Sequence, residues 1–365
     1  MNEIRSAEYV LPGHPDKVCD RIADAIVDAA AIRDPDALVG VEVACHRNVV
    51  FVDGRVAGRE VEGCVDVDAI VRRVYAESGY GGPWGPAPGS LDIRTDLCLG
   101  DLRPGEREIR GHSDDQSIVV GHACGDETTN HLPLEHYVAW RLARSLDGVR
   151  REHTGILGPD GKVLVVMEAA RVKTVSLSIH HAPEAELDRL FVLAGEVVKR
   201  AADGLPGLFP DPDDLDLRLN GAGSFAVGGP MGDNGLSGKK LVVDFYGPRV
   251  AIGGGALSGK DAHKVDRLGA FRARHIAKGL VMSGIAAEAT VHLAYTPGAE
   301  AGEVVRIEAD CPPRVLERWP RAYDLTIEGT FREFGLAGVR FEPLAAWGHF
   351  TSAGAPWEAW ACHAA

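Results

Sequence analysis

Apolar residues recur at helical spacing along much of the chain, and the most regular example follows Pro15. Its apolar stripe, which predicts an amphipathic helix, consists of Val18, Ile22, Ile26 and Ala29. Proline fits the first turn of a helix, so we expect this helix to begin close to Pro15. Aspartates also repeat every four residues here, and we interpret the last three as a solvated face: Asp20, Asp24 and Asp28.

Further helical and extended patterns alternate along the rest of the chain. Helices are expected over 65–79, 133–146, 184–202, 264–282 and 321–334. Extended runs predict a hairpin over 38–52 and strands over 163–167, 172–179, 241–246, 289–295 and 304–308. Residues 79–112 are rich in glycine, proline and charge, and they predict a long loop of the kind that often covers an active site.

Composition narrows the class of protein. A length of 365 residues allows two or three domains, and 45% hydrophobic with 25% charged residues is typical of folded proteins. The net charge of −14 argues against non-specific nucleic-acid binding. No signal peptide and no apolar run of about 18 residues is found, so we expect a cytoplasmic protein without a membrane segment. Seven dispersed cysteines without a C-x-x-C pair indicate a reducing compartment and argue against disulfides or structural zinc.

A glycine- and lysine-rich stretch at 253–267 is the strongest candidate for chemistry. Gly254, four further residues, Gly259 and Lys260 nearly match a phosphate-binding P-loop, but Asp261 stands where that motif needs Ser or Thr. A helix beginning near Asp261 would place Lys260 and Lys264 on one face at its positive end. Asp266 lies nearby and could hold Mg²⁺. An ordinary glycine turn before a helix explains the same residues, so both interpretations stay open.

Three segments that precede this stretch carry similar chemistry. His14, Asp16 and Lys17 share the start of the first predicted helix and could bind phosphate and metal, although a cap or surface role is the simpler explanation. Glu42 lies between valines, where a charge needs a partner or a metal, unless the strand is an edge strand. Residues 221–240 combine glycines with an aromatic, an acid and two lysines that could serve a nucleotide: Phe225, Asp233, Lys239 and Lys240.

Taken together, the motifs resemble those of S-adenosylmethionine synthetases over nearly the whole chain and in the same order. The matching segments are GHPDK at 13–17, DET at 126–128, GGPMGD at 228–233, GLSGKK at 235–240, the stretch 253–267, GHF at 348–350 and PWE at 356–358. The resemblance implies an α/β (α+β) fold of three domains related by a pseudo-threefold axis, each a β-sheet covered by helices. We expect their bounds to be 1–100, 110–228 and 229–365. It also implies a homodimer or homotetramer with active sites between subunits.

The implied reaction converts ATP, L-methionine and water to S-adenosyl-L-methionine, phosphate and diphosphate, with two Mg²⁺ and one K⁺ as cofactors. A thioether sulfur carries no proton, so the attack on C5′ needs no general base, and stabilising the leaving triphosphate should dominate catalysis. By position, the implied catalytic residues are His14, Lys162, Lys260 and Asp266.

The remaining roles are carried over by position in the same way. The resemblance implies ATP contacts at Asp160, Phe225 (stacking on adenine), Asp233, Lys239, Lys240 and Ala256, beside His14, Lys162 and Lys260. It implies Mg²⁺ ligands at Asp16 and Asp266 and a K⁺ ligand at Glu42. Contacts to the sulfur amino acid are implied at Asp115, Asp233, Lys264 and Arg55.

Several departures from the family pattern fall in the amino-acid half of the site. Arg55 replaces a Glu that holds the methionine ammonium, Asp101 and Leu102 replace a Lys-Gln pair, and Ser224 replaces an Arg before Phe225. The alternative functions are therefore the same chemistry on L-homocysteine or a methionine analogue, a non-catalytic ATP-binding regulatory relative, and a P-loop kinase. A thiol nucleophile would need deprotonation, so its rate would rise with pH toward the thiol pKa.

Overall fold

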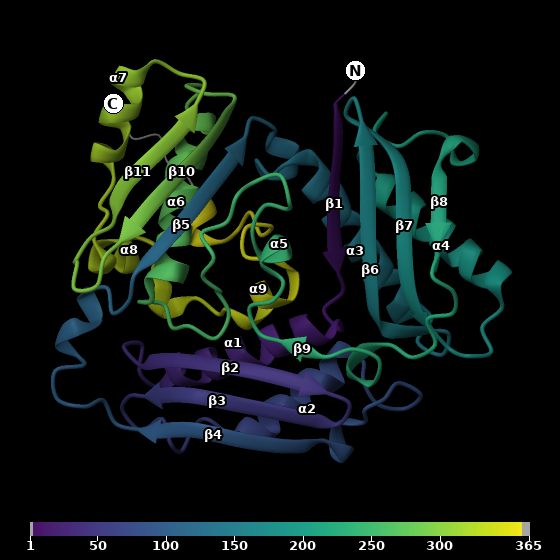
Figure 1. Cartoon of the computed structure of the whole chain (residues 1–365), viewed down its shortest axis with the longest axis horizontal. Helices are drawn as coiled ribbons and strands as arrows, with labels where there is room; N and C mark the ends of the chain where they lie inside the picture. Colours follow the sequence, from purple (N-terminus) through teal and green to yellow (C-terminus); the bar gives the residue numbers. More distant parts are fainter. Residues whose placement is uncertain (1–2, 360–365) are drawn as a thin grey trace.

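The computed structural model describes residues 3–359 and shows three β-sheets arranged around a common centre (Figure 1). The first sheet has the strand order β1-β6-β7-β8, the second β11-β10-β5 and the third β4-β3-β2-β9. The mixed fold with three sheets and covering helices agrees with the predicted α/β (α+β) class.

The strands are β1 (Ile4–Val10), β2 (Leu38–His46), β3 (Val49–Ala57), β4 (Asp92–Gly100), β5 (Ser117–Cys124), β6 (Leu157–Glu168), β7 (Arg171–His181), β8 (Asp216–Leu219), β9 (Gly235–Leu236), β10 (Glu288–Tyr295) and β11 (Glu303–Ala309). The α-helices are α1 (Pro15–Arg33), α2 (Val67–Ser78), α3 (Leu134–Glu152), α4 (Leu187–Ala202), α5 (Leu241–Asp244), α6 (Val265–Met282), α7 (Pro313–Arg318), α8 (Ile327–Glu333) and α9 (Glu342–Trp347). None of the helices in the described part of the chain is long and apolar enough to cross a membrane.

Each sheet includes a strand from a distant part of the sequence. The N-terminal strand β1 pairs antiparallel with β6, β9 pairs with β2, and β5 pairs with β10. The three units are therefore interwoven, and the domain bounds 1–100, 110–228 and 229–365 stay a prediction.

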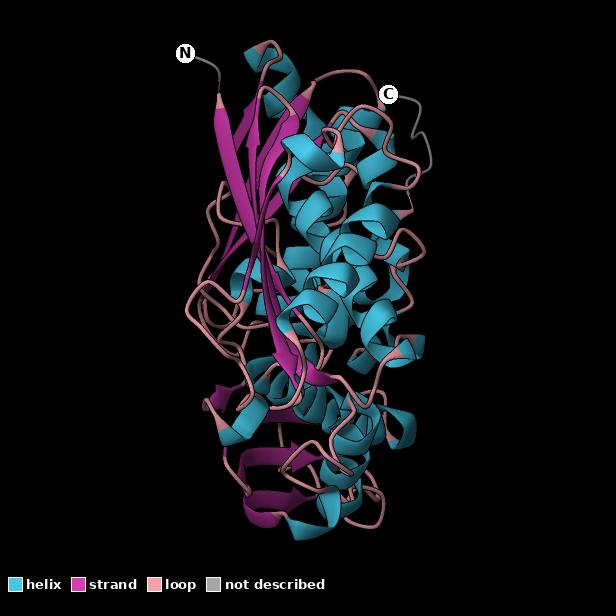
Figure 2. Cartoon of the chain, turned by 90° about the vertical axis from the view of Figure 1, so that its right-hand side faces the viewer, coloured by secondary structure: helices cyan, strands magenta, loops and turns pink. Residues whose placement is uncertain are grey.

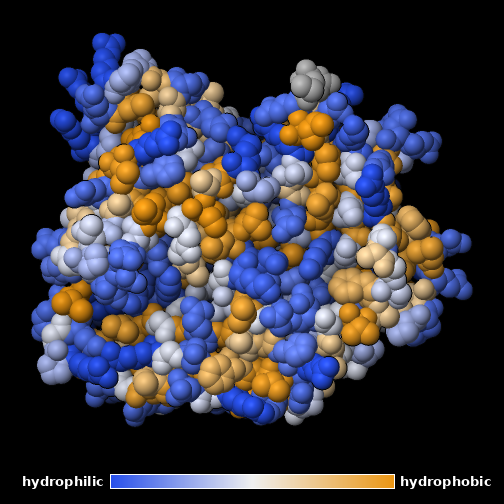
Figure 3. Space-filling model, viewed as in Figure 1, coloured by the Kyte–Doolittle hydropathy of each residue, from blue (hydrophilic) through white to orange (hydrophobic). Residues whose placement is uncertain are grey.

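Helices and strands separate into two layers, with the strands on one side and most helices on the other (Figure 2). One apolar core lies between the first sheet and helices α3 and α4, and a second extends from α1 and its sheet to α6 and its sheet. The opposite faces of the sheets point toward the viewer in Figure 1, and Figure 3 shows apolar groups interspersed with polar ones there. The loops that carry the site residues cross the centre between the sheets.

Three predicted elements differ from the structure. Residues 92–100 form β4, not a loop, because they pair in parallel with β3. Residues 241–246 begin with the short helix α5, not a strand. Helix α6 begins at Val265 with Lys264 at the N-cap, so Asp261 does not cap it. Asp261 instead accepts a hydrogen bond from the Val39 amide, 2.8 Å away, and pairs with Arg110.

The predicted solvated face of the first helix is wrong, because the three aspartates are buried. Asp20 pairs with Lys17 at 2.9 Å, and Asp24 pairs with the buried Arg267. Asp28 accepts hydrogen bonds from the backbone amides of Phe341 and Glu342. Burial raises the pKa of Asp28 to about 6, although the two backbone donors lower it in part. Most of these partners lie more than 200 positions along the chain, so the local repeat could not show them.

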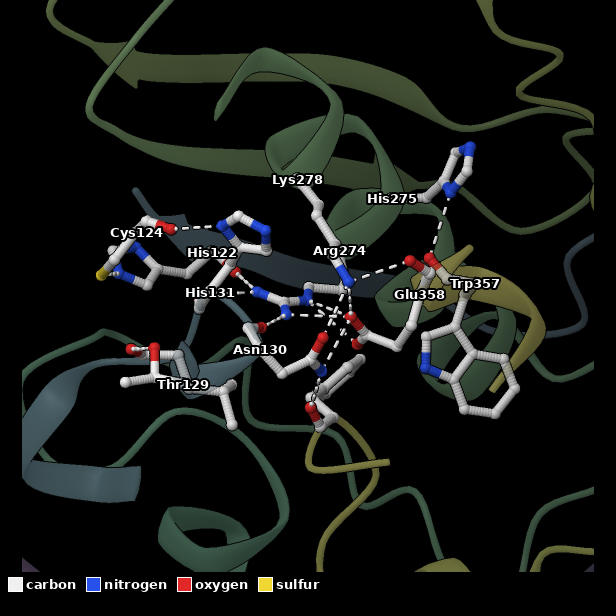
Figure 4. Close-up of polar contacts among 12 residues, drawn as sticks. His122, Cys124, Thr129, Asn130, His131, Arg274, His275, Lys278, Trp357 and Glu358 are labelled. Atoms are coloured by element: carbon white, nitrogen blue, oxygen red, sulfur yellow. Dashed lines mark hydrogen bonds and ion pairs between the residues drawn. The ribbon is translucent and has the colours of Figure 1, made fainter. Parts of the chain in front are cut away.

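The C-terminal tail is held by a buried ionic cluster (Figure 4). Arg274 and Lys278 of α6 both contact the Glu358 carboxylate, at 2.9 and 2.8 Å. The Trp357 ring stacks on Phe271 of the same helix. The Pro-Trp-Glu motif at 356–358 is therefore anchored to α6, and its role here is structural.

Candidate functional site

The N-terminus of α1 presents a buried, neutral histidine. His14 is the N-cap, and its Nδ1 accepts the Asp16 backbone N–H at 3.2 Å. The proton of the neutral ring must then lie on Nε2, which is buried and has no hydrogen-bond partner within the described residues. Burial, and next the nearby Lys162 and Lys240 ammonium groups, lower the pKa of His14 to about 2. His14 thus offers a fixed N–H donor beside positive charge.

Asp16 lies in the first turn of the same helix and contacts two lysines of the glycine-rich region. Its carboxylate is 3.0 Å from Lys240 Nζ and 3.7 Å from Lys239 Nζ. The Leu236 backbone N–H donates to Asp16 Oδ1 at 3.0 Å. The packing of β9 against the start of α1 therefore brings the GHPDK and GLSGKK motifs together. We call His14, Asp16, Lys162, Lys239 and Lys240 the α1 cluster.

Strand β6 completes this cluster with Asp160 and Lys162. Asp160 is buried and accepts the Gly229 backbone N–H at 2.9 Å, and burial raises its pKa to about 6. Lys162 is exposed and opens onto two cavities of about 220 and 430 Å³. Phe225 lines the smaller cavity and Lys240 the larger. Within the described chain Lys162 Nζ makes no ion pair, so its charge is available to a ligand.

Glu42 has a partner in the structure. It lies on β2 with an exposed side chain and accepts a hydrogen bond from Ser237 Oγ. Ser237 Oγ also accepts the Val43 backbone N–H at 2.9 Å. The charge between valines thus points outward at the edge of the α1 cluster, where its free oxygen could still hold a cation.

The glycine stretch at 253–267 folds around Asp266. Lys260 pairs with the Asp266 carboxylate, and Ser117 Oγ of β5 donates to its other oxygen. A Cβ at Gly255 would lie 2.1 Å from Asp266 Oδ1, so only glycine permits this approach. We call Lys260, Lys264 and Asp266 the α6 cluster. Because α6 begins at Val265, five positions after Lys260, the lysine does not sit at a helix start as in a P-loop.

The predicted amino-acid contacts are mostly paired with one another or with loop residues. Lys264 pairs with Asp114, while Asp115 is exposed and its carboxylate accepts the Gln116 backbone N–H. Arg55 of β3 forms a two-pronged pair with Glu106 of the following loop, with 2.8 Å between Nη2 and Oε2. Sequence reasoning missed Glu106, Asp114 and Ser117, because nothing in their local sequence distinguishes them from surface polar residues. It also gave Ser237 no role, although that residue lies within the GLSGKK motif.

The structure does not join the two clusters within one chain. Among residues 3–359, no hydrogen bond or ion pair links the α1 cluster to the α6 cluster. Their loops do approach: a Cβ at Gly238 would lie 2.6 Å from Ala256 Cβ. Asp233 is exposed near His14 and Asp160, where its charge acts on both groups. Lysines around a neutral N–H donor suit a polyanionic ligand, and carboxylates beside them suit a divalent metal.

Comparisons with known proteins match nearly the whole chain. Family models for the N-terminal, central and C-terminal domains of S-adenosylmethionine synthetase match residues 2–85, 110–225 and 227–359. The chain is 35% identical to an S-adenosylmethionine synthase of Nocardioides sp., over 94% of this chain and 92% of that protein. It is 36% identical to that of Thermus thermophilus, over 97% and 95% of the two chains. The identity to that of Clostridium botulinum is 35%, over 98% and 97%.

Proposed function

Because the chain belongs to the S-adenosylmethionine synthetase family, we propose that it is a methionine adenosyltransferase. It transfers the adenosyl group of ATP to the sulfur of L-methionine and hydrolyses the triphosphate to phosphate and diphosphate. The observation that carries this proposal is the unpartnered, buried Nε2–H of His14 among Lys162, Lys239 and Lys240. Such a donor stabilises negative charge without itself giving up a proton.

Each residue of the α1 cluster and its surroundings has a distinct role in the proposed reaction. His14 Nε2–H donates to the oxygen that bridges C5′ and the triphosphate, where charge develops as the bond breaks. Lys162, Lys239 and Lys240 hold the phosphates, and Phe225 stacks on the adenine in the cavity it lines. Methionine sulfur attacks C5′ directly, because a thioether has no proton to remove. Asp160 and Asp233 hold the ribose side of the nucleotide.

The carboxylates fit the expected metal ions. Asp16 is 1% exposed, and its Oδ2 has no hydrogen-bond donor among the described residues, although Lys240 is close. Asp266 offers a second hard oxygen ligand, held by Ser117. These two residues would hold Mg²⁺, and the exposed oxygen of Glu42 would hold K⁺. Bound Mg²⁺ supplies positive charge to the phosphate oxygens.

A second copy of the chain would bring the two clusters together. We propose a homodimer, or a tetramer of such dimers, in which the α1 cluster of one subunit faces the α6 cluster of the other. Large apolar side chains exposed on all three sheets support this, since monomers rarely leave them open: Ile4, Phe51, Ile118, Leu164 and Val305. The strand-bearing face in Figure 3 is where they would pack.

Methionine is the sulfur substrate that this proposal assigns. The exposed Asp115 carboxylate is free to hold the ammonium group, and Lys264 can exchange Asp114 for the substrate carboxylate. Arg55, which departs from the family, is neutralised by Glu106 and so leaves the ammonium site without repulsion. A regulatory ATP-binding relative has no need of this full charge array.

The decisive experiment identifies products. Purified protein is incubated with ATP, Mg²⁺, K⁺ and, in turn, methionine, homocysteine and methionine analogues, and the adenosyl products are identified by mass. We expect S-adenosylmethionine with release of phosphate and diphosphate. Release of ADP, or the absence of any adenosyl product, would refute the proposal.

A further inference from the structure

A second constellation of metal-binding side chains lies on the β5–β10 pair and takes no part in the site described above. Register places Cys124 directly opposite Glu288, and His122 opposite Thr290. His122 and Cys124 are two residues apart on one strand, so their side chains share one face of the sheet. The ligand atoms of His122, Cys124 and Glu288 all lie within 4.8 Å of one another.

The spacing of these atoms matches a tetrahedral metal. His122 Nε2 is 3.3 Å from Cys124 Sγ and 3.7 Å from Glu288 Oε1. Bonds of about 2.0–2.3 Å at tetrahedral angles put neighbouring donor atoms roughly 3.3–3.6 Å apart. Both distances from His122 are therefore close to those of a tetrahedral site, Cys124 and Glu288 lie within 4.8 Å of each other, and water can supply the fourth ligand.

A further contact orients the histidine toward the cluster. His122 is buried, and its Nδ1 lies 2.9 Å from Thr290 Oγ1, which fixes the ring with Nε2 toward Cys124. Such a hydrogen bond on the other ring nitrogen is typical of metal-binding histidines. Figure 4 shows His122 and Cys124 side by side. Glu288 is half-exposed in the single chain and lies at the opposite end of the β5–β10 pair from Ile118.

Arg249 contacts two of the three proposed ligand side chains. Its Nη1 is 2.8 Å from Glu288 Oε1, and its Nη2 is 3.4 Å from Cys124 Sγ. Its Nε is held by Glu135 at 3.0 Å. A metal ion would displace the guanidinium from Cys124 and Glu288, while the bond to Glu135 can persist.

We propose that His122, Cys124 and Glu288 form a binding site for a thiophilic divalent cation of the zinc class, separate from the ATP site. The Cys124 thiol releases its proton to solvent as its sulfur binds the metal, and no electron is transferred. The dispersed cysteines argued against structural zinc, but that argument concerns cysteine pairs. A single cysteine with histidine and glutamate leaves no such spacing signal.

The test uses Co²⁺ as the probe on the full chain, freed of metal by a chelator and kept reduced by a non-thiol reductant. We expect a near-ultraviolet thiolate-to-cobalt absorption that saturates at about one equivalent per chain and is removed by Zn²⁺. The Mg²⁺ site, built from oxygen ligands, cannot produce this absorption. The band should vanish in Cys124→Ser and persist in Cys98→Ser, which removes an exposed cysteine of β4. No band in the wild type, or a band that survives Cys124→Ser, would overturn the proposal.

Two other variants test the geometry without removing the sulfur. Thr290→Val should weaken Co²⁺ binding about tenfold, because the ring loses its orienting contact. Arg249→Gln should strengthen it several-fold, because the competing cation is gone, and weaker binding there would overturn the proposed exchange. If Cys124→Ser fails to fold, Glu288→Gln replaces it: we expect the thiolate band to remain and the affinity to fall, and an unchanged affinity would exclude Glu288 as a ligand. All of these readouts are independent of adenosyl transfer.

Discussion

The two halves of the candidate active site differ in how their charges are satisfied. In the α1 cluster, His14 Nε2 has no partner and Lys162 makes no ion pair within the described residues. On the amino-acid side, Arg55 is paired with Glu106 and Lys264 with Asp114. The first half is organised before ligand arrives, whereas the second must exchange its internal ion pairs for a substrate.

This difference follows from what each half binds. Developing negative charge on a leaving triphosphate is best stabilised by donors that need no rearrangement. An amino-acid substrate carries an ammonium and a carboxylate group. When it binds, a cation and an anion that are paired in the empty pocket can separate, and each can then pair with the oppositely charged group of the substrate. The half that matches the family motifs keeps His14 Nε2 and Lys162 open within the described residues, whereas in the half where Arg55 departs from them the cations are paired with carboxylates.

The largest expected effect comes from removing a cation of the open half. Lys162→Ala should lower the rate of adenosyl transfer about 10²–10³-fold, because the leaving phosphates lose one of their counter-charges. Single-turnover formation of the adenosyl product measures this step. Lys173→Ala is the matched control, since it removes an exposed lysine of the neighbouring strand β7. Equal rates for the two variants would contradict the assignment of Lys162.

A smaller effect is expected from Ser117, which sequence reasoning missed. Its hydroxyl orients Asp266, so Ser117→Ala should raise the Mg²⁺ concentration needed for half-maximal rate about tenfold. The Mg²⁺ dependence of initial rates gives this value. Ser90→Ala, in a surface turn, should leave it unchanged, and Asp266→Asn should raise it further. An unaltered Mg²⁺ requirement in Asp266→Asn would remove this residue from the metal site.

Breaking the Arg55–Glu106 ion pair on the amino-acid side should affect the binding of methionine but not that of ATP. Glu106→Gln leaves Arg55 uncompensated, and its charge then repels the methionine ammonium. Since a partly exposed ion pair contributes up to about 1 kcal/mol, KM for methionine should rise by at most about fivefold. KM for ATP should stay the same, and so should both constants in Glu108→Gln on the same loop. Parallel changes in both KM values would mean that the pair serves loop structure instead.

The smallest expected effect is that of pH on the open half. With its pKa lowered to about 2, His14 stays neutral, so kcat should show no ionisation of this residue between pH 6 and 8. The lowered pKa should instead affect the stability of the fold. In the unfolded chain His14 binds a proton below the ordinary histidine pKa of about 6.5, whereas in the folded chain it does not. The free energy of unfolding therefore falls as pH drops from about 6.5 toward 2. Chemical unfolding of wild type and His14→Asn at pH 7 and 5 compares this loss. The variant should lose less stability, and an equal loss in both proteins would contradict the lowered pKa.

The sequence by itself determined the elements whose partners are close along the chain. The periodic stripe after Pro15 predicted α1, and valine-rich alternation predicted the β2–β3 hairpin. Glycine spacing at 253–267 predicted a turn or a phosphate loop, and the structure shows Gly255 packed closely against Asp266. Local periodicity and local steric limits are properties of neighbouring residues, so they can be read from the chain alone.

Only the tertiary structure decided how distant charges are satisfied. Asp24 belongs to an acidic repeat that predicts a solvated surface, yet it is buried against Arg267. Residues 92–100 lack a clear strand pattern and become β4 through parallel pairing with β3. The Arg55–Glu106 pair also forms only after the loop has folded back on the strand. Burying a charged side chain is costly unless it pairs with an opposite charge. Here the opposite charges belong to distant segments, and only the complete fold brings those segments together.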